Sequence, residues 1–235
     1  MITTLFEFLS GDVDIATIVV NICVLAFVVI CCFPVHESAH AWMANRLGDA
    51  TGRLSGRISL NPAAHLDLIG TLMIVAFGFG YAKPVPVNIN NFPPKKRKLY
   101  FGLTALAGPV SNILLTVIFL LCKNVVNVLY VRTGIPENLA TAAYTFFRYA
   151  ASVNIALAVF NLIPIPPLDG SRVLTAVLPD RIYYKLLRYE RYSMMALFVL
   201  IFVFDRIGFS PVSLLSEFIY KGLNYVCTLP FKMFF

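Results

Sequence analysis

Charged residues are scarce in this chain of 235 residues. Only 13% of the residues are charged and 59% are hydrophobic, whereas soluble domains average about 25% charged residues. This scarcity excludes an ordinary soluble domain and predicts an all-α polytopic membrane protein. The formal net charge of +7 does not indicate nucleic-acid binding, because the basic residues cluster between apolar segments, as in the cytoplasmic loops of membrane proteins. We expect contact with the lipid bilayer and none with nucleic acid.

Disulfide and leader signals are also missing. The five cysteines form no C-x-x-C pair and lie in apolar segments, which is typical of small hydrophobic residues rather than of a disulfide framework. The first 15 residues include acidic residues but no Lys or Arg, so they lack the basic region of a cleavable signal peptide. We therefore expect the first apolar segment to be retained, with its start outside the cytoplasm.

Long apolar segments predict a bundle of about five to six transmembrane helices. The 31 residues between Asp14 and Arg46 exceed the roughly 20 that a helix needs to cross the hydrocarbon core. Further candidate spans cover residues 100–131, 138–164, 192–206 and 211–230. We expect one membrane-embedded domain over residues 1–235, with a core at about 15–178 and C-terminal helices over 179–235.

Basic residues predict the orientation of these spans. Lys and Arg gather after the first span, in the run at residues 95–98 and over residues 172–191, and we assign these segments to the cytoplasmic side. This assignment holds only if apolar residues 66–82 enter and leave on one face, so we predict a re-entrant segment there, with an ordinary short span as the alternative. The sequence TGRLSGRISLNP at residues 51–62 predicts a short strand or β-hairpin.

The sequence FPVHESAHAW at residues 33–42 contains an H-E-x-x-H motif. On a helix, His36 and His40 lie on one face and can bind the same metal ion. Glu37 lies about 100° further around the helix, where it can accept a proton from a water molecule that zinc activates. Ionisable groups are costly in a membrane span and are usually functional. We therefore interpret the motif as a metal site rather than a hydrogen-bonded histidine pair.

A catalytic zinc site needs a third protein ligand. The candidates are His65 and Asp67, beyond the first span, and Asp169, in the sequence NLIPIPPLDG at residues 161–170. We favour Asp169, because the first span and the span at 138–164 both run inward, so that both motifs end on one face. The preceding prolines also restrict the backbone there. Alternatively, Asp169 is the N-cap of a short helix that follows it.

Three motifs together resemble the site-2 protease family of intramembrane zinc metalloproteases. They are H-E-x-x-H in the first span, AGPVSN at residues 107–112, and NLIPIPPLDG. The resemblance covers about residues 20–178, and the stretches at 56–72 and 77–88 are similar to the small bacterial branch that lacks PDZ and CBS domains. Ser171 stands where the family usually has the second glycine of L-D-G-G.

The resemblance implies that His36, His40 and Asp169 bind one Zn²⁺ per chain, with Glu37 as the base. It also implies cleavage of the transmembrane segments of membrane-protein substrates, near the cytoplasmic face of a bacterial cell membrane. Asn161 matches a family asparagine that contacts the substrate or stabilises the oxyanion, as its amide N–H can do. The alternative is that Asn161 bonds a neighbouring helix.

Other polar residues near these motifs receive structural interpretations. His65 and Asp67 are predicted to form a hydrogen-bonded pair that fixes a loop, or else to support a metal ligand. Gly108 and Asn112 are expected to set close helix packing, because small residues let backbones approach.

The sequence therefore predicts an intramembrane zinc metalloendopeptidase. The alternatives are a membrane protein that binds or transports metal through the same residues, and a non-catalytic scaffold. Glu37 argues against a transporter, which needs ligands but no base beside them. The sequence indicates no particular oligomeric state.

Overall fold

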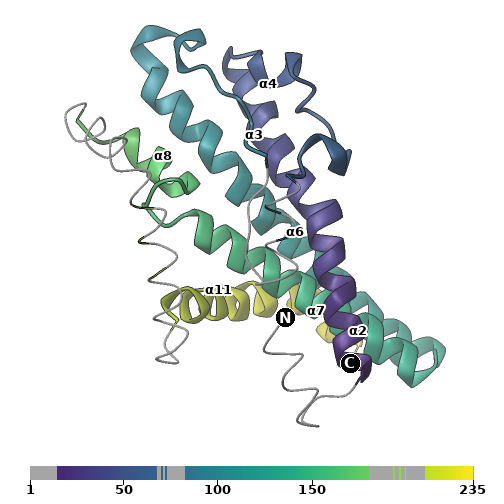
Figure 1. Cartoon of the computed structure of the whole chain (residues 1–235). Coiled ribbons are helices and arrows are strands. Elements are labelled where there is room, and N and C mark those ends of the chain that lie inside the picture. Colours follow the sequence, from purple (N-terminus) through teal and green to yellow (C-terminus); the bar gives the residue numbers. More distant parts are fainter. Residues whose placement is uncertain are drawn as a thin grey trace.

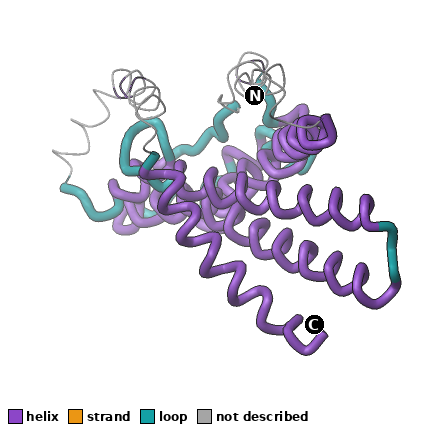
Figure 2. Tube along the Cα trace, turned by 90° about the horizontal axis from the view of Figure 1, so that it is seen from below, coloured by secondary structure: helices purple, strands orange, loops and turns teal. Residues whose placement is uncertain are grey.

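The computed structural model describes most of the chain, namely residues 15–67, 70, 72, 83–179, 193, 196, 199 and 210–234. Every regular element in this part is a helix, and Figure 2 shows only helices and loops there. Three segments are long and apolar enough to cross a membrane: Ile18–Leu47, Pro94–Thr133 and Glu137–Asn161. The all-α fold class is confirmed for these residues.

The predicted count of five to six spans is not confirmed. The candidate span at 192–206 lies mostly outside the described residues. The segment at 211–230 forms the helix α11 (Pro211–Thr228), but α11 is not among the three described segments that could cross a membrane. The described residues therefore support three spans.

The first span consists of three consecutive elements: α2 (Ile15–Phe27), the π-helical turn η1 (Val28–Cys32) and α3 (Phe33–Leu47). Pro34 follows the π-helical turn and has no N–H to donate to the preceding turn. Just before it, the Phe33 N–H donates to the carbonyl of Val28, five residues earlier, which is the hydrogen bond of a π-helical turn. Such π-helical turns are frequent at functional sites, and this one directly precedes the H-E-x-x-H motif.

Two long antiparallel helices pack beside the first span. They are α6 (Arg97–Thr133) and α7 (Glu137–Asn161), and a short connection at residues 134–136 joins them (Figure 2). Gly134 ends α6 with a φ of 63°, a left-handed conformation that favours glycine. α11 packs against both helices.

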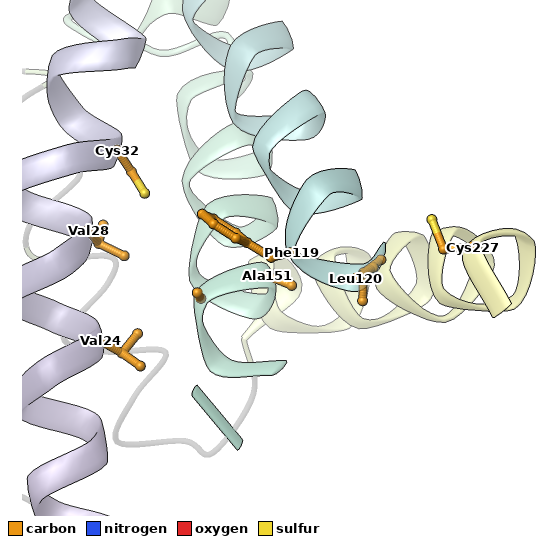
Figure 3. Packing of buried hydrophobic residues seen from close by; sticks show 8 residues of the cluster. Val24, Val28, Cys32, Phe119, Leu120, Ala151 and Cys227 are labelled. Atoms are coloured by element: carbon orange, nitrogen blue, oxygen red, sulfur yellow. The ribbon is translucent and has the colours of Figure 1, made fainter. Parts of the chain in front are cut away.

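A cluster of buried apolar residues joins these four helical segments (Figure 3). Its members come from the first span, α6, α7 and α11: Val24, Val28, Cys32, Phe119, Leu120, Ala150, Ala151 and Cys227. The opposite end of the molecule carries the short elements (Figure 1), which are α4 (Thr51–Leu54), η2 (Pro62–Ala64), η3 (Ile89–Asn91), η4 (Pro94–Lys96) and α8 (Asp169–Thr175). The apolar core and the loop-rich end are thus separate regions.

The predicted strand or β-hairpin at residues 51–62 is not confirmed. Residues 51–54 form the helical turn α4, and residues 57–61 form no strand. The Ser38 hydroxyl lies within hydrogen-bond distance of the Ser59 carbonyl and accepts a bond from the Ser59 N–H at 3.1 Å. His65 Nε2 lies 2.7 Å from the same carbonyl. Side chains therefore satisfy the main-chain N–H and C=O of Ser59, which a strand partner would otherwise bond.

The interior of the predicted re-entrant segment, residues 66–82, lies largely outside the described residues, so its path stays a prediction. Its two ends do lie side by side. The Lys83 N–H donates to the His65 carbonyl at 2.7 Å, and Arg57 Nη1 donates to the carbonyls of Ala64 and Lys83. This proximity is compatible with a segment that enters and leaves on one face.

Candidate metal centre

Three potential metal ligands meet between α3, α6 and α8. His36 Nε2 and His40 Nε2 lie 3.1 Å apart. Asp169 Oδ2 lies 3.3 Å from His36 Nε2 and 3.2 Å from His40 Nε2. All three residues are buried. The structure thus brings together the three predicted ligands, which are 129 residues apart in sequence from His40 to Asp169.

The donor set fits a zinc ion. Two imidazole nitrogens and one carboxylate oxygen form a typical ligand set of catalytic zinc. Tetrahedral zinc with bonds of about 2.0–2.1 Å holds its ligand atoms about 3.3 Å apart, and the three separations here are 3.1, 3.2 and 3.3 Å. Three protein ligands leave the fourth position for water or substrate.

A main-chain carbonyl of α6 orients His40. His40 Nδ1 lies 2.8 Å from the Thr104 carbonyl oxygen, which can only accept a hydrogen bond. Nδ1 therefore carries the proton, and the lone pair of Nε2 faces His36 and Asp169. Metal-binding histidines are commonly held in this way. The Nδ1 atom of His36 is buried and has no hydrogen-bond partner in the described part of the chain.

Gly108 makes room for both imidazoles. A Cβ at this position of α6 would lie 2.6 Å from His36 Cε1 and 2.5 Å from His40 Cε1, closer than real Cβ contacts. No larger residue fits unless the histidines move. Gly108 thus does more than set the predicted helix packing, because it lets α6 form one wall of the candidate metal centre.

Asp169 is the first residue of α8, and Leu168 is the N-cap. The alternative prediction, in which Asp169 is the N-cap, is therefore wrong. Gly170 holds this turn close to the end of α7, since a Cβ there would lie 2.6 Å from the Ile163 carbonyl oxygen. Burial alone would raise the pKa of the Asp169 carboxyl, but the adjacent His40 and His36 hold that pKa below its usual range.

Serine is accommodated where the family usually has a second glycine. The Ser171 hydroxyl donates to the Leu168 carbonyl at 2.7 Å, within the same turn that carries Asp169. The substitution therefore adds a hydrogen bond to this turn and leaves the ligand in place.

A cavity of about 390 Å³ opens beside the three ligands. Its wall includes Glu37, which is half-buried and forms no hydrogen bond with the described residues. Asn161 also lines the cavity, and its Nδ2 donates to the Leu157 carbonyl at 3.0 Å. One N–H of the Asn161 amide thus donates to its own helix, and the second N–H is left to donate to another group. The predicted catalytic residues both face the cavity that contains the ligands.

His65 and Asp67 do not form the predicted pair. His65 Nε2 bonds the Ser59 carbonyl, whereas Asp67 Oδ1 accepts from the Gly70 N–H at 2.9 Å. Neither side chain forms a hydrogen bond with a predicted metal ligand. His65 is fully buried and fixes the loop beside α3, which agrees with the loop-fixing part of the prediction.

Comparisons with known proteins agree with this geometry. The profile of peptidase family M50 matches residues 24–204. "Putative zinc metalloprotease YwhC" of Bacillus subtilis is 41% identical over 181 residues, which cover 75% of this chain and 78% of that protein. A second relative, "Putative zinc metalloprotease MJ0611" of Methanocaldococcus jannaschii, is 29% identical over 46% of this chain and 49% of its own length.

A third relative has a slightly lower identity than the second but aligns over a longer stretch of this chain. "Putative zinc metalloprotease Rip2" of Mycolicibacterium smegmatis is 27% identical over 57% of this chain and 49% of that protein. No solved structure gives a significant match. The family match covers most of the first span, including His36 and His40, together with the AGPVSN motif and Asp169, which are the parts that build the candidate metal centre. The chain therefore belongs to peptidase family M50, the site-2 protease family.

Proposed function

We propose that this protein is an intramembrane zinc metalloendopeptidase that cleaves peptide bonds in or near the transmembrane segments of membrane proteins. The observation that carries the proposal is the convergence of His36, His40 and Asp169 in the wall of a cavity that Glu37 also lines. Two of these ligands and Glu37 lie on a helix that could cross a membrane. Membership of peptidase family M50 supports the same reaction class.

His36, His40 and Asp169 would hold one zinc ion. The bound zinc would polarise the scissile carbonyl and lower the pKa of the attacking water. The Thr104 carbonyl and Gly108 keep His40 in position for binding. Because all three ligands are buried, bulk water has little access to their side chains, and electrostatic interactions in the site are correspondingly strong.

Glu37 acts as general base and then as general acid. Its carboxylate has no competing hydrogen bond in the described part of the chain, so it can accept a proton from the attacking water and later deliver it to the leaving amine. Asn161 directs the free N–H of its amide at the negative charge that develops on the carbonyl oxygen.

The substrate must reach this cavity as an extended chain, because a transmembrane helix shields its peptide bonds with internal hydrogen bonds. The substrate is therefore expected to unwind locally between α3, α6, α7 and α8. The cavity is lined by Phe101 and Thr104 in the first turns of α6, the helix that begins within the run Lys95–Lys98. Since Lys and Arg accumulate on the cytoplasmic side, the cleavage site faces the cytoplasmic side of the cell membrane.

Purified protein tests the proposal. Wild type and Glu37→Gln are given candidate single-pass membrane proteins in detergent micelles, and zinc content is measured for both. We expect cleavage by wild type alone, with about one zinc per chain in both proteins. Equal cleavage by Glu37→Gln would refute the assignment of Glu37. Zinc binding without cleavage of any substrate by wild type would instead favour a metal-binding membrane protein.

A further inference from the structure

Asn112 is a buried polar residue to which the proposed reaction gives no role. It lies on α6, four residues after Gly108, and is 1% exposed. Its Oδ1 atom is buried and has no hydrogen-bond partner in the described part of the chain. A buried polar atom without a partner is costly. A partner from outside the chain would remove this cost.

The position of Asn112 shows where such a partner would lie. Asn112 lines the same cavity as His36, Glu37 and Asp169. Residues four apart on a helix share one face, with Cβ atoms about 5–6 Å apart. Since Gly108 lies against both imidazoles, the amide of Asn112 lies about one helical turn further along the same wall. An extended peptide covers that distance with about two residues.

The chemistry of Asn112 fits a peptide main chain. A carboxamide offers one acceptor and two donor hydrogens, which complement the N–H and C=O of a peptide group. Apolar side chains also line the cavity, including Phe33, Leu157 and Phe160. An unwound substrate would leave main-chain groups unpaired in these surroundings, which is unfavourable.

We propose that Asn112 binds the main chain of the unwound substrate within about two residues of the scissile bond. Its Oδ1 accepts a hydrogen bond from a substrate N–H. This role rests on the proposed function and adds a binding contact to it. It also differs from the role of Asn161, which uses part of its amide to bond its own helix.

Asn154 offers a matched control. It is also a fully buried asparagine whose Oδ1 has no partner in the described residues. It lies on α7, it is not among the residues that line the cavity, and its Nδ2 bonds the Ala150 carbonyl and Cys32 Sγ. Leucine has the same branching as asparagine but no hydrogen-bonding atoms, so Asn112→Leu and Asn154→Leu both remove an amide. Leucine is also larger, and because both sites are buried, Asn154→Leu controls for the effect of the added volume on stability.

Binding is measured without turnover, on the full-length, zinc-loaded Glu37→Gln protein in detergent micelles. The probe is a fluorescein-labelled peptide of about 20 Leu and Ala residues with a central Gly-Gly pair. We expect Asn112→Leu to weaken binding of this probe about 5–10-fold, the effect of one hydrogen bond. Asn154→Leu should lower the melting temperature and leave the affinity unchanged. Unchanged affinity in Asn112→Leu, or no binding of the probe by the parent protein, overturns the proposal.

Ester-substituted probes separate a direct contact from a structural effect. Each version of the probe replaces one peptide N–H near the Gly-Gly pair with an ester oxygen. At one position the ester should weaken binding to the parent about 5–10-fold and cause no further loss in Asn112→Leu. Equal ester effects in both proteins at every position would show that Asn112 makes no such bond. Cleavage by wild type is scored separately, so the proposed protease activity and the role of Asn112 can fail independently.

Discussion

The two halves of α6 differ in how they pack. Over residues 102–112 the buried residues are small or polar, and the helix lies against the candidate metal ligands and α8. Over residues 116–124 the buried residues include the large apolar Phe119 and Leu120, which belong to the apolar cluster, besides the polar Thr116, Lys123 and Asn124. The function of the first half therefore requires small side chains, which leave room for the metal ligands and α8. The stability of the second half requires large apolar side chains, which fill the core. Added volume should damage the first half, and removed volume should damage the second.

Gly108→Ala tests the first half and should have the largest effect. The added Cβ overlaps both imidazoles, so one histidine must leave its position as a ligand. We expect zinc affinity to fall at least about 10–100-fold, with a matching loss of proteolysis. The measurement is the zinc content of the purified protein at a series of free zinc concentrations.

Gly222→Ala is the control for this substitution. Gly222 is also a helical glycine, but a Cβ there meets nothing within 4 Å. Alanine is favoured over glycine inside helices by about 1 kcal/mol, so this variant should keep its zinc and be no less stable. Normal zinc binding by Gly108→Ala would show that the first half of α6 tolerates added volume after all.

Leu120→Ala tests the second half. Leu120 is fully buried in the apolar cluster, and truncating such a residue lowers the free energy of unfolding by about 2–5 kcal/mol. Zinc affinity should stay unchanged, because the cluster is separate from the ligands. Unfolding by denaturant in micelles measures the first quantity, and zinc titration measures the second.

Ile118→Ala provides the comparison on the same helix. Ile118 is 51% exposed, so its truncation removes fewer packing contacts and should cost clearly less than that of Leu120. If Leu120→Ala lost zinc while remaining stable, the two halves of α6 would not be energetically separate.

Much of the metal centre could be predicted from sequence. The spacing of His36 and His40 places both on one helix face, and the shared direction that we predict for two spans places Asp169 at the same end. The structure does bring these three side chains together, in keeping with helix periodicity and membrane topology, which restrict where such residues can lie. The ligand separations, by contrast, depend on how closely α6 and α8 approach α3, which a single sequence does not specify.

The contributions of α6 and of the loops could not be predicted in the same way. The group that orients His40 is the main-chain carbonyl of Thr104, and every residue type has such a carbonyl. The strand prediction at residues 51–62 is not confirmed: residues 51–54 are helical, and the Ser38 side chain bonds the main chain of Ser59. A bond between residues 21 positions apart leaves no local sequence pattern.

Hydrogen bonds to a buried carboxylate join the loops at the end of α3, beside the buried side chains of Val85 and Phe92. Asp49 is fully buried and lies two residues beyond the first span. Its carboxylate accepts from the Asn88 N–H and from Asn91 Nδ2, each at 2.7 Å, and from the Thr51 N–H at 3.1 Å. Burial raises the pKa of the Asp49 carboxyl, but these bonds and the Thr51 hydroxyl outweigh it and lower the pKa below 3.8.

Asp49→Asn should have a smaller effect than Gly108→Ala or Leu120→Ala, and the effect should depend on pH. Because the folded state lowers the pKa of Asp49, its stabilising contribution is fully present above the ordinary value of 3.8 and is lost as the pH falls through the folded-state pKa. We expect a loss of about 1–3 kcal/mol in the free energy of unfolding at pH 7, shrinking below pH 3.8. The cost of Leu120→Ala should not change over the same range, since no charge is involved. If the two costs follow the same pH profile, hydrogen bonding to the Asp49 carboxylate does not distinguish the loop-rich end from the apolar core.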